Sequence, residues 1–182
     1  ACLENLRQMS AASAAYGADH GGAWPRNNTA KGDDRFYFST EICPYLNLSP
    51  EMLKNNLRSV FVCPADREGP EGLKGVYRSV GYPLSYGQNA WLGSDKMAFT
   101  AGQRRGGAML PSQLMVMIDF EGHWVISSST MTDEREESLR HRHNGHLNVA
   151  YADGHIAPAK IEEFWGKGGD SKQAFPFFQG RE

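Results

Sequence analysis

Apolar residues recur at helical spacing near the start of the chain. They fall three or four positions apart from Leu3 to Tyr16, which predicts an amphipathic helix over roughly residues 2–18. No Ser, Thr, Asp or Asn precedes Leu3 to cap this helix, and the chain starts without Met. We therefore expect the helix to continue upstream of Ala1, with a frayed terminus as the alternative. Its other end is expected at Gly21-Gly22.

The middle of the chain has weaker patterns. Ser49 followed by Pro50 predicts the start of a short helix, extending to about residue 56. Residues 59–63, of which all but Ser59 are apolar, predict a strand or extended segment, ended by a proline. Residues 64–110 are rich in Gly, Ser, Tyr and Asn, and predict a long loop region with a strand near residues 81–89.

The C-terminal third shows strand patterns. Residues 114–118 form a continuous apolar run, which predicts a buried strand, and residues 123–126 predict a return strand. Large apolar residues at 147, 149 and 151 alternate with asparagine or alanine, which predicts a strand over 147–152, and Asp153-Gly154 is typical of a two-residue hairpin. A helix followed by antiparallel strands predicts an α+β fold. No linker divides the chain, so we expect one domain over residues 1–182.

Composition excludes several classes of protein. The 182 residues include 19 Lys and Arg against 21 Asp and Glu, so the net charge is −2 and nucleic acid is not an expected partner. Hydrophobic residues make up 40% and charged residues 22%, which is typical of a globular domain. No window approaches the roughly 20 apolar residues that a membrane helix needs.

The cysteines are Cys2, Cys43 and Cys63, and no C-x-x-C pair occurs. This spacing excludes a zinc ribbon and a thioredoxin-type site. Cys43 and Cys63 each precede a proline, and in an oxidising compartment they could pair; two buried thiols are the alternative. Cys2 has no obvious partner in the sequence.

Five of the six histidines lie between residues 123 and 155. A strand over 147–152 would separate His143 from Asp153 by roughly 20 Å, so one ion could not hold both. Asp119 follows the strand 114–118, and antiparallel pairing would bring it to His143. We expect a structural hydrogen bond there and no cofactor, with half of a divalent-cation site as the alternative. Asp153 is expected in a turn and His155 on a strand face.

Four segments together resemble a known family. His143, nine residues and then Asp153-Gly154 resemble the C-terminal H-x9-D-G signature of bacterial pseudopilin-like proteins with a prepilin-type N-terminus. Residues 2–9, 61–66 and 85–89 resemble the other motifs of that family. Tyr151 stands where Phe is commoner, and His146 where a small residue is usual.

The resemblance implies a type IV pilin-like fold, with an N-terminal helix packed on an antiparallel sheet and its apolar half upstream of Ala1. It implies a structural subunit of a type II secretion-like pseudopilus or pilin-like filament, not an enzyme. Its partners would be other pilin-like subunits, a prepilin peptidase and the inner membrane, and its location the periplasm or cell surface.

The implied periplasmic address favours a Cys43–Cys63 disulfide with Cys2 free, since disulfides persist in that compartment. A second hypothesis stays open beside the filament subunit. It is a metal-dependent enzyme or sugar-binding module that uses a cluster of Asp119, His123, His143 and His155.

Overall fold

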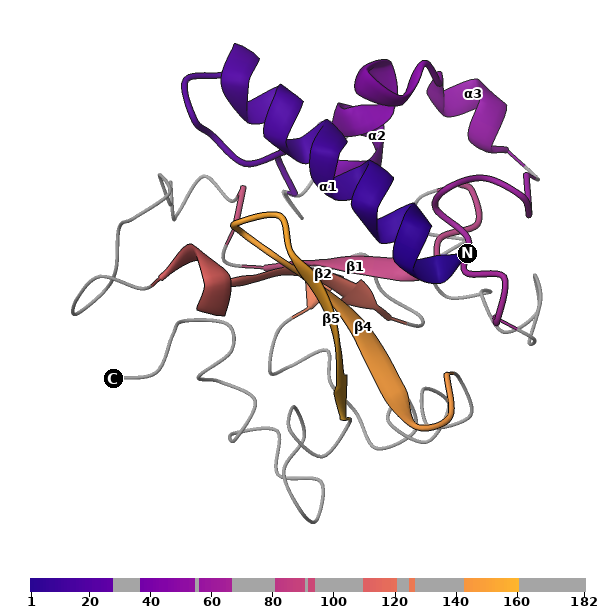
Figure 1. Ribbon diagram of the computed structural model, residues 1–182. Helices are drawn as coiled ribbons and strands as arrows, with labels where there is room; N and C mark the ends of the chain where they lie inside the picture. Colours follow the sequence, from indigo (N-terminus) through magenta and orange to yellow (C-terminus); the bar gives the residue numbers. More distant parts are fainter. Residues whose placement is uncertain are drawn as a thin grey trace.

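The computed structural model describes residues 1–27, 37–54, 56–66, 81–90, 92–93, 110–120, 125–126 and 143–160. These residues form an α+β fold, as the sequence predicts, in two layers. Figure 1 shows the long helix α1 lying across one face of the sheet, with the shorter helices α2 and α3 beside it. Within the described residues, no helix is both long enough and apolar enough to cross a membrane.

Helix α1 (Cys2–Asp19) matches the predicted helix to within one residue. Its buried positions include Cys2, Leu6 and Met9, whereas Leu3 is 38% exposed. The apolar stripe therefore begins one residue earlier than the leucine pattern suggests, because Cys2 and Leu6 share one side of the helix. At the other end, Gly22 N donates to Gly17 O at 2.7 Å, which closes the last turn.

Three short helical elements follow. Helix α2 (Phe38–Ile42) and the 3-10 helix η1 (Cys43–Leu46) were not predicted, and α3 (Pro50–Leu53) is shorter than expected. Ser49 occupies the N-cap position of α3, but its side chain makes no capping hydrogen bond. The first two elements have too few residues for a helical period to be visible in the sequence.

A polar contact ties this helical group to α1. Tyr16, on α1, donates its hydroxyl to Glu41 Oε2 at 2.9 Å. Arg26 binds the same carboxylate through Nε at 2.9 Å and Nη2 at 3.1 Å. A bidentate guanidinium fixes the orientation of the carboxylate, and Glu41 therefore positions α2 against α1.

The sheet has the strand order β3-β1-β2-β4-β5. Its strands are β1 (Tyr86–Asn89), β2 (Met115–Asp119), β3 (Val125–Ile126), β4 (His146–Tyr151) and β5 (Ile156–Lys160). Neighbours pair antiparallel except for β3, which pairs in parallel with β1. The return strand expected after β2 therefore does not pair with β2, whose two edges are taken by β1 and β4.

The strand or extended segment predicted for residues 59–63 is wrong. This segment turns instead, with Val62 N donating to Ser59 O at 3.0 Å and Asp66 N donating to Cys63 O at 2.9 Å. Three of its four apolar residues are nevertheless buried, Phe61 completely, and Val60 is partly buried. Burial in a turning segment gives the same apolar run as burial in a strand, so the pattern alone could not separate the two.

The hairpin between β4 and β5 is present, but its loop is one residue longer than predicted. Gly154 N donates to Tyr151 O at 2.9 Å, and Tyr151 N donates to His155 O at 3.0 Å. Residues 152–154 therefore form a three-residue loop. Gly154 has φ +87°, as the bulge position of such loops requires.

Candidate functional site

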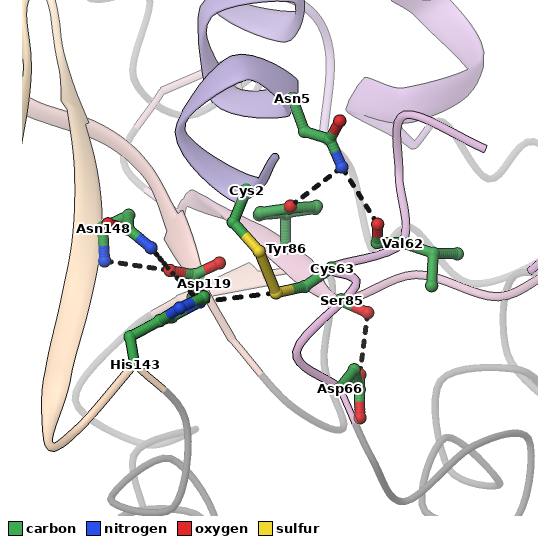
Figure 2. Close-up of a disulfide and its surroundings, with 10 residues drawn as sticks. All are labelled: Cys2, Asn5, Val62, Cys63, Asp66, Ser85, Tyr86, Asp119, His143 and Asn148. Atoms are coloured by element: carbon green, nitrogen blue, oxygen red, sulfur yellow. Dashed lines mark hydrogen bonds and ion pairs between the residues drawn. A yellow bond between two sulfur atoms is a disulfide. The ribbon is translucent and has the colours of Figure 1, made fainter. Parts of the chain in front are cut away.

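One disulfide joins the first turn of α1 to the turning segment 56–66 (Figure 2). It links Cys2 to Cys63, whose Cα atoms lie 5.4 Å apart. The predicted Cys43–Cys63 pair is therefore wrong, and Cys2 is not free. The reason is the helical phase of Cys2, which places its side chain on the buried face of α1 toward Cys63.

Cys43 is instead a buried free thiol in η1. Its Sγ donates to Ser39 O at 3.1 Å. Burial, assisted by the negative charge of Glu51, raises the pKa of this thiol to about 11. Cys43 therefore stays protonated at neutral pH and is a poor nucleophile and a poor metal ligand.

Polar side chains fix the surroundings of the disulfide. Asn5 donates through Nδ2 to Val62 O at 3.0 Å and to the Tyr86 hydroxyl at 3.2 Å. Ser85 donates its hydroxyl to Asp66 Oδ2 at 2.7 Å. These contacts join α1, segment 56–66 and β1 independently of the sulfur–sulfur bond (Figure 2).

Asp119 and His143 lie together beside this disulfide, as the antiparallel pairing of β2 and β4 predicts. His143 Nε2 is 3.4 Å from Asp119 Oδ2, and the aspartate side chain is completely buried. Asn148 donates to the same oxygen through its backbone N at 2.9 Å and its Nδ2 at 2.7 Å. Within the described residues, the other carboxylate oxygen, Oδ1, has no hydrogen-bond partner.

His143 also contacts the disulfide. The same Nε2 atom lies 3.3 Å from Cys63 Sγ. The backbone turns sharply here, since His143, Asn144 and Gly145 all have positive φ, at +45°, +57° and +79°. Two successive non-glycine residues in this region are uncommon. The turn places the imidazole over the end of the sheet.

Asp153 and His155 form a second, separate pair at the opposite end of β4. His155 N donates to Asp153 Oδ1 at 3.1 Å, and the His155 ring stacks on Tyr151 with centroids 4.2 Å apart. The hydrogen bond from the His155 backbone lowers the pKa of Asp153, with further contributions from the His155 side chain. Asp153 is thus a turn residue, as predicted.

The cluster proposed for a metal-dependent enzyme is therefore not assembled as expected. Strand β4 separates His155 from Asp119 and His143, and His123 lies outside the described residues. Instead, Cys2 and Cys63 complete a four-residue group with Asp119 and His143. One ligand atom from each lies within 4.8 Å of all the others.

The sequence did not reveal that Cys2 belongs to this site or that Asn148 holds its aspartate. Cys2 could have been assigned from its helical phase with Leu6 and Met9, both buried. Asn148 gave no signal beyond its place in an alternating strand. Its role depends on the register of β2 and β4, which a single sequence does not contain.

The contacts of His143 do not form a nucleophilic relay. In a Cys–His–Asp arrangement, the acid binds the ring nitrogen opposite the one that faces the sulfur. Here Asp119 and Cys63 both lie on Nε2. Cys63 is also in a disulfide and carries no thiolate. The oxidised group can therefore support the fold, but it is not arranged for acyl transfer.

Comparison with protein-family models, with curated proteins and with solved structures finds no significant match to this chain.

Proposed function

We propose that this chain is a structural subunit of a type II secretion-like pseudopilus or a type IV pilin-like filament. The proposal is carried by α1, which buries one face against the sheet and leaves the opposite face exposed. Ala11 and Ala15 lie on that exposed face. A helix held in this way presents a free surface along which helices of other subunits can pack.

The disulfide supports an exported location. Disulfides persist in the periplasm and outside the cell, whereas cytosolic thiols are kept reduced. The Cys2–Cys63 bond also fixes the first turn of α1 to the globular body. If force acts along the N-terminal helix of a subunit in a filament, this bond keeps the start of the helix attached to the globular body.

The motif residues also have structural tasks. His143 contacts the buried carboxylate of Asp119, and Asp153 and Gly154 shape the β4–β5 hairpin. Both contacts shape the fold, and neither requires a catalytic centre. We therefore propose that the protein acts by packing against other subunits, and not by turnover.

The first test is processing and location of the full-length gene product. We expect the reading frame to encode a prepilin leader and about 20 apolar residues ahead of Ala1. Coexpression with a prepilin peptidase should shorten the protein and leave it in the membrane with its globular part in the periplasm. A product that stays in the cytoplasm with reduced cysteines contradicts the proposal.

The second test is assembly. Ala15→Arg adds a charge to the exposed face of α1 and should leave the fold intact. It should abolish assembly, measured as the loss of chemical cross-linking between subunits. Met52→Arg is the matched control, because Met52 is 56% exposed but lies on α3. If both variants assemble like the wild type, the exposed face of α1 is not a packing surface.

A further inference from the structure

We propose that the reduced protein binds one Zn²⁺ ion between Cys2, Cys63, His143 and Asp119. This inference does not rest on the proposed filament. The candidate ligand atoms all lie within 4.8 Å of one another. They come from the start of α1, segment 56–66, the end of β2 and the turn before β4, and converge at one end of the sheet (Figure 2).

The position of the imidazole is the first argument for an ion. The single nitrogen Nε2 of His143 faces both Cys63 Sγ, at 3.3 Å, and Asp119 Oδ2, at 3.4 Å. Zinc bonds of about 2.0–2.3 Å in a tetrahedron place neighbouring ligand atoms about 3.3–3.8 Å apart. The Nε2–Sγ contact thus has the length expected between two ligands of a common zinc ion, and one oxygen of the Asp119 carboxylate lies within 4.8 Å of both atoms.

The identity of the ligands selects the metal. Two cysteine sulfurs, one imidazole and one carboxylate are typical zinc ligands. Calcium and magnesium prefer sites made of oxygen atoms, and thiolates disfavour both. Four protein ligands would complete the tetrahedron, so the site would be structural and closed.

The carboxylate is already held as a zinc ligand would be. Asn148 donates twice to Asp119 Oδ2, at 2.9 Å and 2.7 Å, and fixes its orientation from the adjacent strand. Within the described residues, the buried Oδ1 atom accepts no hydrogen bond. A buried carboxylate oxygen without a donor is costly, and a bound cation would satisfy it.

The disulfide and the zinc site are mutually exclusive states of one cluster. A dithiol reductant supplies two electrons and two protons to the sulfur–sulfur bond, which yields two thiols while the reductant becomes a disulfide. Binding of Zn²⁺ then displaces the two thiol protons to solvent, because only thiolates are ligands. Zinc therefore stabilises the reduced form by a free energy that rises with the logarithm of the free zinc concentration, once this exceeds the dissociation constant.

The test uses the full chain with Zn²⁺ alone as the probe. The protein is reduced with a phosphine, which takes the oxygen of one water while the two hydrogens pass to the sulfurs. It is then dialysed against zinc without oxygen. We expect one equivalent of bound zinc in the reduced protein and none in the disulfide form. Cobalt substituted for zinc should give tetrahedral d–d bands and a thiolate charge-transfer band.

Variants separate this site from adventitious binding. Cys2→Ala and His143→Ala should abolish stoichiometric binding, and Asn148→Ala should weaken affinity about 10- to 100-fold, as losses of outer-shell partners do. Cys43→Ala and His155→Ala are the matched controls and should bind like the wild type. Circular dichroism of each reduced variant establishes that it is folded.

Two results would overturn the proposal. One is a folded, reduced wild-type protein that takes up no zinc. The other is zinc binding that survives in folded His143→Ala with unchanged affinity, because the imidazole would then not be a ligand.

Discussion

Two Asp–His pairs lie at opposite ends of β4, and they differ in almost every physical respect. Asp119 and His143 meet across the sheet, with the carboxylate fully buried. Asp153 and His155 are two residues apart in a turn, and their side chains are 36% and 44% exposed. The first pair is held by topology, and the second by local backbone geometry.

The difference explains why the histidine and the aspartate of the H-x9-D-G spacing have separate roles. Nine residues separate the histidine of one pair from the aspartate of the other, and the length of β4 lies between them. The two motif residues therefore never meet. Each serves its own end of the strand, the buried end as a side-chain anchor and the exposed end as a turn.

The largest expected effect comes from removing the disulfide at the buried end. The double variant Cys2→Ala/Cys63→Ala opens a loop with a sequence separation of 61 residues. In the chain-entropy model this costs about 4 kcal/mol of unfolding free energy. A domain of this size should then lose about 8–16 °C in Tm, measured by circular dichroism without reductant.

Cys43→Ala is the control for this effect. It removes a buried thiol and one hydrogen bond to Ser39 but leaves the disulfide, so a loss of about 1 kcal/mol is expected. Reductant should lower the Tm of metal-free wild type and of Cys43→Ala, but not that of the double variant. Equal Tm values for Cys43→Ala and for the double variant would show that the disulfide contributes no more to stability than the Cys43 thiol does.

The next effect comes from the buried aspartate. Asp119→Ala leaves the backbone N and the Nδ2 of Asn148 without their acceptor. Each buried unsatisfied donor costs about 1–3 kcal/mol, so we expect a loss of about 3 kcal/mol in urea unfolding. Asp153→Ala is the matched change at the exposed end and should stay close to wild type. A similar loss of unfolding free energy in Asp119→Ala and Asp153→Ala would contradict the difference between the buried and the exposed pair.

A smaller effect is expected from His143, whose side chain is only partly buried. His143→Ala removes a contact of Asp119 and should cost about 1–3 kcal/mol, or several degrees in Tm. His143→Asn is an informative second variant, because Asn tolerates the positive φ at this position. If His143→Asn restores the full Tm, backbone conformation and not the imidazole contact explains the loss. His155→Ala should leave Tm nearly unchanged.

Sequence reasoning succeeded where an element carries its own local signal. Helix α1 and strand β4 were found from their periods, strand β2 from its continuous apolar run, and the hairpin turn from its Asp-Gly pair. The proximity of Asp119 and His143 followed once β2 and β4 were taken as antiparallel neighbours. Their meeting is a consequence of register at the ends of two adjacent strands.

The errors concern contacts that depend on three-dimensional packing. All three cysteines are buried, so burial does not distinguish Cys2 from Cys43 as the partner of Cys63. Only the helical phase of α1 selects Cys2. The parallel pairing of β3 with β1 also depends on which strand edges are already occupied. Neither choice changes the local hydrophobic pattern, so neither was visible in it.

The smallest expected effect lies at the exposed end, in the titration of Asp153. Its pKa should be below the ordinary value of 3.8, chiefly because the backbone N–H of His155 donates to the carboxylate. A lowered pKa in the folded state means that the ionised turn stabilises the fold above the ordinary pKa. This contribution is lost as the pH falls through the folded-state value.

Carbon-13 NMR of the side-chain carboxyl can measure this pKa, with the urea-unfolded chain as the reference. His155→Ala keeps the backbone donor and removes only the ring, so the pKa should rise partway and remain below that of the unfolded chain. A complete return to the unfolded value would mean that the imidazole, and not the turn backbone, holds the charge. The exposed pair would then resemble the buried one in mechanism, because a side chain would control its aspartate.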